Sequence, residues 1–435
     1  EHLTQARASV KPDSIATIIY TSGTTGTPKG VMLTHANLVF DLLAAVAALP
    51  VIDPNDVILS YLPLCHSFER IANYFMFACG AQIVLAESIE TLAENMRDAR
   101  PTIVTSVPRM FERMHKRILE SIQTQPEKKQ KIFHWAVRTG KQYKAKFRTR
   151  IISPLFHIKY ALAEKLVFVK LRSRVGGRMR FFVSGGAALS KDLGEFFDAA
   201  GITIIEGYGM TEASPVISVN PTHGYKFGTV GKPLPGVEVK IASDGEILTH
   251  GGHVMLGYWQ NETATQEAID ADGWLHTGDI GTIDGEGYIA ITDRKKDLFV
   301  SSGGKNIAPQ HIENLLLESP YIDQIVLVGD HKPFIAALIV PEFTMLREAA
   351  EKKGIPSLPN EEFIKHSEII TMIEKDINTL QSALANFERV RRFTLLAEPF
   401  TVESGDLTPT LKVKRSIVTK KFSAQIQRMY AEVLN

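Results

Sequence analysis

Cysteine and long apolar runs are both scarce in this chain. Cys65 and Cys79 are the only cysteines among its 435 residues, too few for a disulfide framework or a four-cysteine zinc site. They point to a reducing, cytoplasmic setting. The longest nearly uncharged apolar stretch, residues 42–52, contains Pro50. It is shorter than the roughly 20 residues that cross a bilayer, so we expect no membrane span.

Signals for secretion, disorder and fibrous structure are also missing. The first residues lack the order of basic, apolar and small residues that marks a signal peptide, so we expect none. With 44% hydrophobic and 22% charged residues, 31 Gly and 21 Pro, the composition excludes a disordered or collagen-like chain. A globular protein of this length divides into roughly two or three domains.

The net charge of +1 hides an uneven distribution of charge along the chain. Residues 110–180 contain 19 Lys and Arg but four acidic residues, so this block carries +15 and the rest of the chain −14. Its pattern predicts mostly helix with interleaved aromatic residues. An anionic membrane surface suits such a segment, and a solvated helical face is the plainer alternative. No nucleic-acid recognition motif accompanies the block, so we expect no nucleic-acid partner.

The first 210 residues alternate short β-rich apolar runs with amphipathic stretches of helical length. Strands are predicted at 15–20, 57–61, 81–85, 102–106, 179–184 and 203–205, with intervening helices such as 36–48, 67–77 and 191–200. Apolar runs without strict alternation favour strands that are buried on both faces of a parallel sheet. The predicted fold class is therefore α/β, with mostly parallel sheets flanked by helices.

Two further regions complete the predicted organisation. Many glycines and short β runs at 228–292 predict a β-rich, antiparallel subdomain. After the charged, turn-prone segment 293–297, a helix at 307–317, strands at 324–328 and 334–340, and charged helices predict a small α+β domain. We place the boundary at this junction, which gives a large domain at 1–295 and a small one at 296–435.

The segment from Tyr20 to Gly30, YTSGTTGTPKG, combines glycines, hydroxyls and one lysine after a predicted strand. Glycines let the backbone come close to a ligand. Amides, hydroxyls and the Lys29 ammonium can surround an anion. We therefore interpret the loop as a polyphosphate site rather than a surface turn. A Walker A loop needs Gly-Lys-Ser/Thr, whereas Pro28 precedes Lys29 and Gly30 follows it, which disfavours a P-loop NTPase.

This loop resembles the phosphate loop of the AMP-forming adenylating superfamily, which includes the acyl-CoA synthetases. Four further motifs resemble those of the family in the same order: GYGMTE at 207–212, WLHTGD at 274–279, DR at 293–294 and TPTLKVKR at 408–415. The LPLCHSFER segment at 62–70, the pattern at 272–297 and the helical insertion at 110–175 are similar to the long-chain group. The resemblance covers residues 20–415. It implies a long-chain fatty acid–CoA ligase that uses ATP, CoA and Mg²⁺.

The resemblance also implies a nucleotide site. In it, Tyr208 stacks on adenine, Thr211 touches the α-phosphate, and Glu212 binds Mg²⁺, a cation that takes few protein ligands beside substrate phosphates. Asp279 and Arg294 hold the ribose. The remaining ATP contacts are implied at Thr21, Ser22, Gly23, Thr24, Thr25, Gly26, Lys29, Gly185, Gly186, Ala187, Gly207 and Gly209. Taken alone, several of these residues have plainer interpretations, such as a core tyrosine or a turn aspartate.

A two-step reaction follows from the same resemblance. Lys412, on a mobile C-terminal domain, stabilises the charge that develops as a fatty carboxylate attacks the α-phosphorus of ATP; Lys414 is the alternative lysine. The small domain then turns about Lys296. The path of CoA is implied at Ser302, Gly303 and Gly304. His66 resembles the residue that separates the acyl and CoA paths, and a core histidine is the alternative.

One departure from the family concerns the start of the chain. Long-chain members have a longer segment before the phosphate loop, whereas 19 residues precede Tyr20 here, so we expect a fragment that lacks the N-terminal subdomain. Two alternatives stay open: a fatty acyl-AMP ligase that loads a carrier protein, and a truncated, non-catalytic nucleotide- or acyl-binding chain. The expected partners are fatty acid, ATP and CoA, with peripheral contact on the inner face of a membrane through 110–180. An oligomer is left open.

Overall fold

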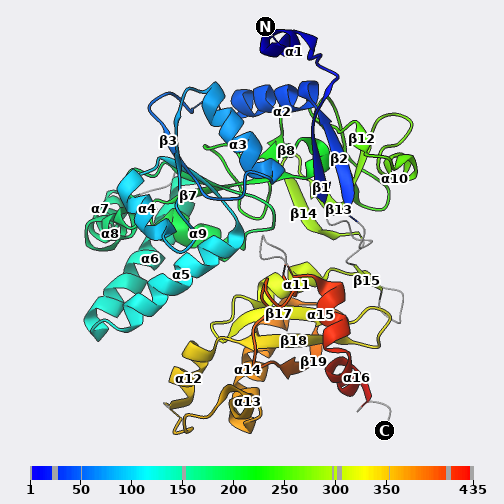
Figure 1. Cartoon of the computed structure of the whole chain (residues 1–435). Coiled ribbons are helices and arrows are strands. Elements are labelled where there is room, and N and C mark those ends of the chain that lie inside the picture. The colour runs from blue at the N-terminus through cyan, green and yellow to red at the C-terminus, as the bar shows by residue number, and fades with distance from the viewer. Residues whose placement is uncertain are drawn as a thin grey trace. The chain divides into compact units, whose positions relative to one another are not determined.

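The computed structural model describes residues 2–21, 28–49, 51–148, 153–295, 298–300, 306–351, 353–407 and 413–431. The chain divides into two compact units, residues 1–291 and 292–435. Both units combine helices and strands (Figure 1).

A seven-stranded sheet forms the centre of the first unit. Its strand order is β4 (Gln82–Leu85), β3 (Val57–Ser60), β5 (Ile103–Ser106), β6 (Phe181–Ser184), β7 (Thr203–Gly209), β8 (Val216–Val219) and β9 (Lys232–Pro233). Neighbours from β4 to β7 are parallel, and β8 and β9 add antiparallel pairs at one edge. Every residue of β3 and β5 is buried, because helices cover both faces of a parallel sheet. The predicted α/β fold is thus confirmed.

The helices of the first unit follow the predicted pattern closely. They are α1 (His2–Ser9), α2 (His35–Ala48), α3 (Ser67–Ala78), α4 (Leu92–Ala99), α5 (Pro108–Gln123), α6 (Glu127–Arg148), α7 (Pro154–Ala163), η1 (Glu164–Phe168), α8 (Val169–Ser173), α9 (Lys191–Ala199), η2 (Thr211–Ala213) and α10 (Glu262–Ala268). Helix α2 begins where Thr34 and Asn37 form a reciprocal capping box, which satisfies amides that the first turn leaves unpaired. The basic block is helical along α5 to α8, as predicted.

Two smaller antiparallel sheets complete this part of the chain. The first has the order β1 (Ile15–Thr21), β2 (Lys29–Thr34) and β12 (Gly257–Tyr258). The second has the order β10 (Glu238–Ile241), β11 (Glu246–His250), β13 (Leu275–Ile283) and β14 (Ile289–Arg294). The placement of strand 15–20 in the parallel sheet was therefore wrong. Strand β1 forms a hairpin with β2, a strand that the sequence pattern did not predict.

The second unit is an α+β domain, as predicted. Strands β17 (Ile322–Val328) and β18 (Ile335–Pro341) pair antiparallel, and β19 (Val390–Leu395) adds a parallel strand to β18. A two-stranded pair is formed by β15 (Phe299–Val300) and β16 (Asn306–Ile307). The helices are α11 (Pro309–Leu316), α12 (Phe343–Glu351), α13 (Asn360–Phe363), α14 (Ser367–Leu380), η3 (Gln381–Ala383), α15 (Arg415–Lys421) and α16 (Ser423–Ala431). The sequence pattern did not predict β19, because only helices were expected there.

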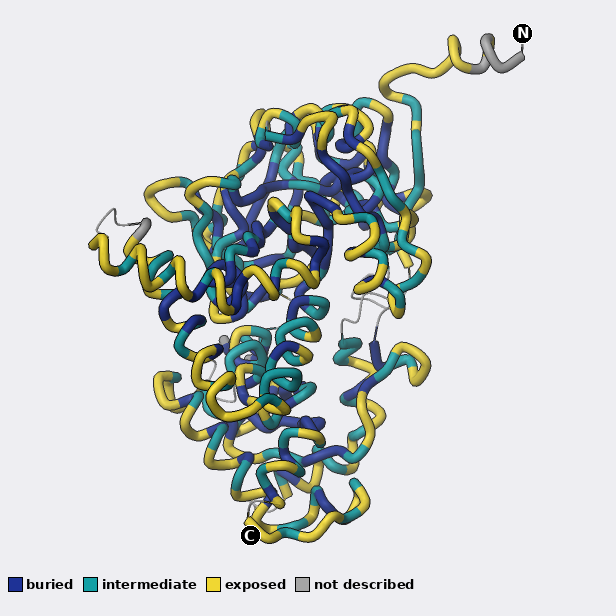
Figure 2. Tube along the Cα trace, turned by 90° about the vertical axis from the view of Figure 1, so that its left-hand side faces the viewer, coloured by how far each residue is buried: buried dark blue, intermediate teal, exposed yellow. Residues whose placement is uncertain are grey.

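Buried apolar residues form separate clusters in the two units (Figure 2). In the first unit, one cluster lies under α2, α3 and the small sheets, and the other lies between the parallel sheet and helices α5 to α9. Among the described residues, no helix combines the length and the apolar content that a bilayer crossing needs.

Candidate active site

The ends of β1 and β2 fix the two ends of the predicted phosphate loop. Thr21 lies opposite Lys29, and Tyr20 lies opposite Gly30. Residue 30 has no room for a side chain, because a Cβ there would lie 2.9 Å from Ile18 Cγ2. The predicted contacts Ser22, Gly23, Thr24, Thr25 and Gly26 lie outside the described residues.

A segment far away in the sequence, residues 255–259, joins this hairpin to the GYGMTE motif. Tyr258 of β12 pairs with Val31 of β2, and the amide of Trp259 donates to the carbonyl of Gly30 at 2.7 Å. The amide of Met255 donates to the carbonyl of Glu212 at 2.9 Å. One short segment therefore holds both sides of the candidate site through its backbone.

The side chain of Tyr258 makes the same connection. Its hydroxyl donates to Glu212 Oε1 at 2.9 Å, and both residues are buried. The ammonium of Lys29 lies 5.0 Å from the centre of the Tyr258 ring, within range of a cation–π interaction. Burial, together with the neighbouring Glu212, raises the pKa of Tyr258, so its hydroxyl stays protonated and remains a donor. Tyr258 was not predicted as a site residue.

The predicted residues Thr211 and Glu212 form a short turn, η2, directly beyond the end of β7. The hydroxyl of Thr211 lies 3.2 Å from that of Ser67, the first residue of α3. His66 is the N-cap residue of the same helix and is half-buried. The structure thus brings the LPLCHSFER segment beside the GYGMTE motif.

The GYGMTE and WLHTGD motifs meet through one hydrogen bond. Tyr208 donates to Asp279 Oδ2 at 2.7 Å, and both side chains are buried. The sequence predicts a Gly-rich loop at 207–211 and a Gly-flanked turn at Asp279, and the structure differs at both places. Gly207, Tyr208 and Gly209 belong to strand β7 rather than to a loop, because they pair with β8, and Asp279 lies within β13 rather than in a turn.

Side chains of neighbouring residues hold the backbone around Asp279. The amide of Asp279 donates to Thr277 Oγ1 at 3.1 Å, and the amide of Gly278 donates to Glu246 Oε1 at 2.9 Å. Gly278 has a φ of +71°, a conformation that costs glycine little.

The SGGAA segment at 184–188 begins at Ser184, the last residue of β6. A Cβ on Gly185 would lie 3.1 Å from the ring of Phe68 in α3, and Gly186 has a φ of +82°. The amide of Leu189, just beyond exposed Ala187, donates to Glu206 Oε2 at 3.2 Å. Burial raises the pKa of Glu206 to about 7.

Sequence reasoning also missed a buried carboxyl group beneath the start of α3. Ser60 donates to Glu69 Oε1 at 2.5 Å, and Thr105 donates to Glu69 Oε2 at 2.6 Å. Asn73 donates to Ser60 Oγ at 3.2 Å. Burial raises the pKa of Glu69. The available signal was an acidic residue on the apolar face of an otherwise amphipathic helix.

Several predicted residues cannot be added to this cluster. Lys296, Ser302, Gly303, Gly304 and Lys412 lie outside the described residues. Arg294 is the last residue of β14 and belongs to the second unit.

A cation would find few protein ligands here. Within the described ranges, no group of three or more His, Cys, Asp or Glu side chains could hold a metal ion. Tyr258 holds Glu212 Oε1, and no hydrogen bond within the described part of the chain occupies Glu212 Oε2. A single carboxylate oxygen fits Mg²⁺ bound mainly through substrate phosphates and water.

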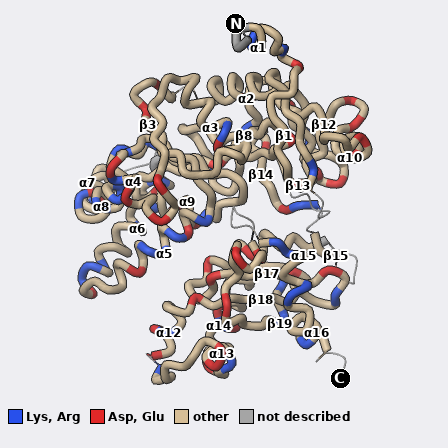
Figure 3. The backbone as a smooth tube through the Cα atoms, in the orientation of Figure 1, with Lys and Arg blue, Asp and Glu red and all other residues tan. Residues whose placement is uncertain are grey.

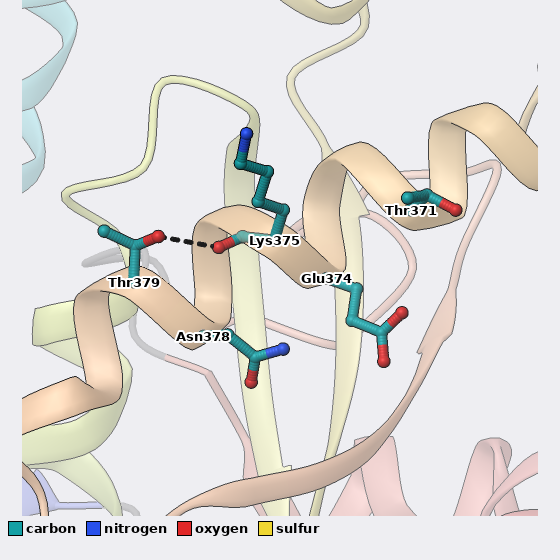
Figure 4. Close-up of a pocket in the computed structure, with 5 residues that line it drawn as sticks. All are labelled: Thr371, Glu374, Lys375, Asn378 and Thr379. Atoms are coloured by element: carbon teal, nitrogen blue, oxygen red, sulfur yellow. Dashed lines mark hydrogen bonds between the residues drawn. The ribbon is translucent and has the colours of Figure 1, made fainter.

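A shallow groove in the second unit offers no competing site. Its lining residues, Thr371, Glu374, Lys375, Asn378 and Thr379, all belong to α14 (Figure 4). Thr379 donates to the carbonyl of Lys375 within that helix at 2.8 Å. A groove formed by one exposed helix face lacks the converging polar groups of a catalytic pocket.

Known proteins place this geometry in context. The family described as AMP-binding enzyme matches residues 2–259, and the AMP-binding enzyme C-terminal domain matches residues 296–434. The protein named long-chain-fatty-acid–CoA ligase FadD15 of Mycobacterium bovis is 39% identical over 99% of this chain and 74% of its own length. Long chain acyl-CoA synthetase 6, peroxisomal, of Arabidopsis thaliana is 36% identical over 97% of this chain and 62% of its own length.

Solved structures of adenylating enzymes share the fold of this chain. The crystal structure of the ATP-bound RpMatB-BxBclM chimera B1 is 25% identical, with a TM-score of 0.68 over 97% of this chain and 72% of its own. The adenylation domain of a carboxylate reductase from Mycobacterium chelonae shares the fold, with a TM-score of 0.72 at 22% identity over 97% of this chain and 61% of its own. The chain therefore belongs to the AMP-binding enzyme family and, within it, to the AMP-forming acyl-CoA synthetases.

Proposed function

We propose that this protein activates long-chain fatty acids with ATP and transfers them to CoA through an acyl-adenylate. The names of the curated relatives support the substrate class. The observation that carries the proposal is the connection of Lys29, Tyr258 and Glu212. It joins the ammonium of Lys29 at the predicted phosphate loop to the carboxylate of Glu212 in the GYGMTE motif.

In the first step the fatty carboxylate attacks the α-phosphorus of ATP, and pyrophosphate leaves. Lys29 would contact phosphate oxygens, and Thr211 would donate to the α-phosphate. Tyr208 and Asp279, joined at 2.7 Å, would bind adenosine, together with Arg294. Glu212 would hold Mg²⁺, which when bound neutralises phosphate charge and orients the leaving group.

In the second step the thiol of CoA attacks the acyl carbonyl, and AMP leaves. We propose that a small domain at 296–435 turns about Lys296 between the steps. Lys412 would serve the first orientation, and residues 302–304 would border CoA in the second. His66, beside the α3 N-terminus, would separate the acyl and CoA paths.

The test follows pyrophosphate exchange and AMP release by the full-length protein with a ladder of fatty acids. We expect fatty acid-dependent exchange without CoA, and AMP release that also requires CoA. Exchange without CoA-dependent AMP release would indicate an acyl-AMP ligase instead. ATP binding measured by calorimetry, with neither exchange nor AMP release, would overturn the proposal in favour of a nucleotide-binding protein.

A further inference from the structure

An exposed row of apolar side chains runs along α7, η1 and α8. Its members recur every three or four residues, the spacing of one helix face. Their exposed fractions are 62% for Leu155, 66% for Ile158, 49% for Leu162, 41% for Leu166 and 50% for Val169. We call these five residues the outer stripe.

The outer stripe is not needed to hold the helices in the fold. The opposite face of the same helices already packs against the core through Ala163, Val167, Phe168 and Leu171, all buried. Tyr160 on that face stacks on Tyr143 of α6, with ring centres 4.0 Å apart. These helices are therefore apolar on two faces, and the second face is open to solvent.

Basic residues accompany the outer stripe. Lys159, Lys165 and Lys170 are exposed, and each lies next to a stripe residue in the sequence or one turn away. In Figure 3 the backbone positions of Lys and Arg are blue, and several lie along α7 and α8. Their one acidic residue, Glu164, pairs with Arg172, so it does not compete for these lysines.

Two other lysines of the block are paired with acidic residues of α9. Lys141 lies 3.3 Å from Asp192 of α9, and Lys144 lies 3.2 Å from Asp198. Within the described residues no ion pair involves Lys159, Lys165 or Lys170. Three lysines without a described ion pair thus lie along the outer stripe, and the nearby Glu164 pairs with Arg172.

We propose that the outer stripe and its three lysines dock the protein on an anionic phospholipid bilayer. An amphipathic helix with apolar side chains on one side and lysines at the border lies in the plane of a bilayer surface. There the leucines enter the acyl region, while lysine stems reach back to the headgroups. An interface with a second copy is disfavoured, because pairing two stripes would bring like charges together.

The experiment measures co-sedimentation of the full chain with vesicles in the absence of ATP, so its outcome does not depend on the proposed enzymatic activity. Vesicles of phosphatidylcholine with phosphatidylglycerol are compared with phosphatidylcholine alone. We expect binding to the anionic vesicles that weakens with salt. Replacing the two most exposed residues, Leu155→Ser with Ile158→Ser, should weaken it by on the order of tenfold or more. Lys159→Gln with Lys170→Gln should weaken it by on the order of tenfold.

Matched controls separate docking from general surface effects. Leu43 of α2 is as exposed as Leu155, at 62%, and Leu43→Ser should leave vesicle binding unchanged. Lys365→Gln with Lys375→Gln removes two exposed lysines of the second unit and should also have no effect. Thermal unfolding confirms that each variant is folded. Equal binding to both vesicle types, or equal binding by the stripe variants and wild type, would overturn the proposal. So would a stripe variant that changes the oligomeric state but not vesicle binding.

Discussion

Tyr258 serves two functional groups from different parts of the chain at once. Its hydroxyl holds one oxygen of Glu212, and its ring faces the ammonium of Lys29. A buried hydrogen bond to a carboxylate is worth about 1.5–3 kcal/mol. We therefore regard Tyr258 as a positioning residue. By holding Oε1, it fixes the orientation of the Glu212 carboxylate and so the direction in which Oε2 points.

Replacing Tyr258 by Phe separates these two contacts. The Tyr258→Phe variant keeps the ring for Lys29 but loses the donor to Glu212. We expect the Mg²⁺ concentration for half-maximal pyrophosphate exchange to rise by roughly three- to tenfold, in line with loss of about 1 kcal/mol of positioning. Glu212→Gln should shift it further in the same direction.

Tyr288→Phe is the matched control for this variant. Tyr288 also donates a hydrogen bond, to the carbonyl of Gly224 at 2.6 Å, and Lys226 lies 4.4 Å from its ring centre. It belongs to neither the WLHTGD motif nor the DR motif. Its variant should keep the wild-type Mg²⁺ response. If Tyr258→Phe shows the same response as Tyr288→Phe, Tyr258 has no role in positioning Glu212.

Glu206 makes folding stability depend on pH in an unusual direction. Burial raises its pKa from 4.5 to about 7, so the folded state keeps a proton that the unfolded state loses. The contribution of Glu206 to the free energy of unfolding is therefore fully present below about pH 4.5 and is lost as pH rises through about 7. The shift corresponds to roughly 3 kcal/mol.

Removing the titrating group should remove this pH dependence. We compare the free energy of unfolding of the Glu206→Gln variant with that of wild type. The difference should favour the variant by roughly 2–3 kcal/mol more at pH 8 than at pH 5. Urea unfolding at the two pH values measures the difference. Glu267→Gln, at an exposed position of α10, should show none. If the stability difference between wild type and the Glu206→Gln variant is the same at both pH values, Glu206 titrates normally.

At the scale of elements, the start of α3 is fixed by the Glu69 network. Glu69 reaches from α3 to Ser60 of β3 and Thr105 of β5. It thereby sets the position of Ser67 against Thr211 and of the neighbouring His66. The helix is thus anchored to the parallel sheet at the end that carries the site.

Loss of this carboxyl group should loosen the anchor. We expect Glu69→Ala to lower the free energy of unfolding by about 2–3 kcal/mol, because two buried hydroxyls lose their acceptor. Glu69→Gln should cost less, since it keeps one acceptor oxygen. Urea unfolding measures both, with Glu267→Ala as the exposed control. An equal effect of the Glu69 and Glu267 alanine variants would contradict the anchoring role.

The elements that the sequence predicted correctly are those with a clear apolar period. Strands β3 (VILS) and β5 (IVTS) are short, fully buried runs that begin with apolar residues. Helices α3 and α9 have amphipathic spacing, so local pattern and burial agree. Strand β19 was missed because its sequence, VRRFTL, places two arginines in succession. Only its pairing with the buried strand β18 makes it a strand, and such pairing is a tertiary effect.

The same distinction applies to the site. Motif residues could be predicted because they are adjacent in the sequence. Tyr258 and Glu69 could not, because their roles arise from contacts 46 and 36 residues away with Glu212 and Thr105. The hairpin of β1 and β2 was not predicted, because β2 directly follows the Gly-rich loop residues and its first residues belong to the predicted phosphate loop.

At the scale of the whole molecule, the two units carry different parts of the proposed reaction. The large unit holds Lys29, Tyr208, Glu212 and Asp279, whereas Lys412 is in the second. If Lys412 reaches the nucleotide only during adenylation, its loss should impair adenylation and spare the transfer to CoA. Separating the two half-reactions therefore tests the division.

We expect Lys412→Ala to reduce fatty acid-dependent pyrophosphate exchange by on the order of 10²–10³ fold. Thiolysis of added acyl-AMP by CoA should be nearly unchanged. Lys414→Ala tests the alternative lysine. Lys414 is the N-cap residue of α15 and lies two residues away, and its variant should keep both half-reactions if Lys412 serves adenylation. Equal loss of both half-reactions in Lys412→Ala would contradict a mechanism with two orientations.

Strand β12 is two residues long, yet it has a practical consequence for anyone shortening the protein. Ending the chain before residue 255 would remove the partner of Val31 and the donor to Glu212 together. We expect that a minimal nucleotide-binding version must extend through Trp259, although the phosphate loop itself ends more than two hundred residues earlier.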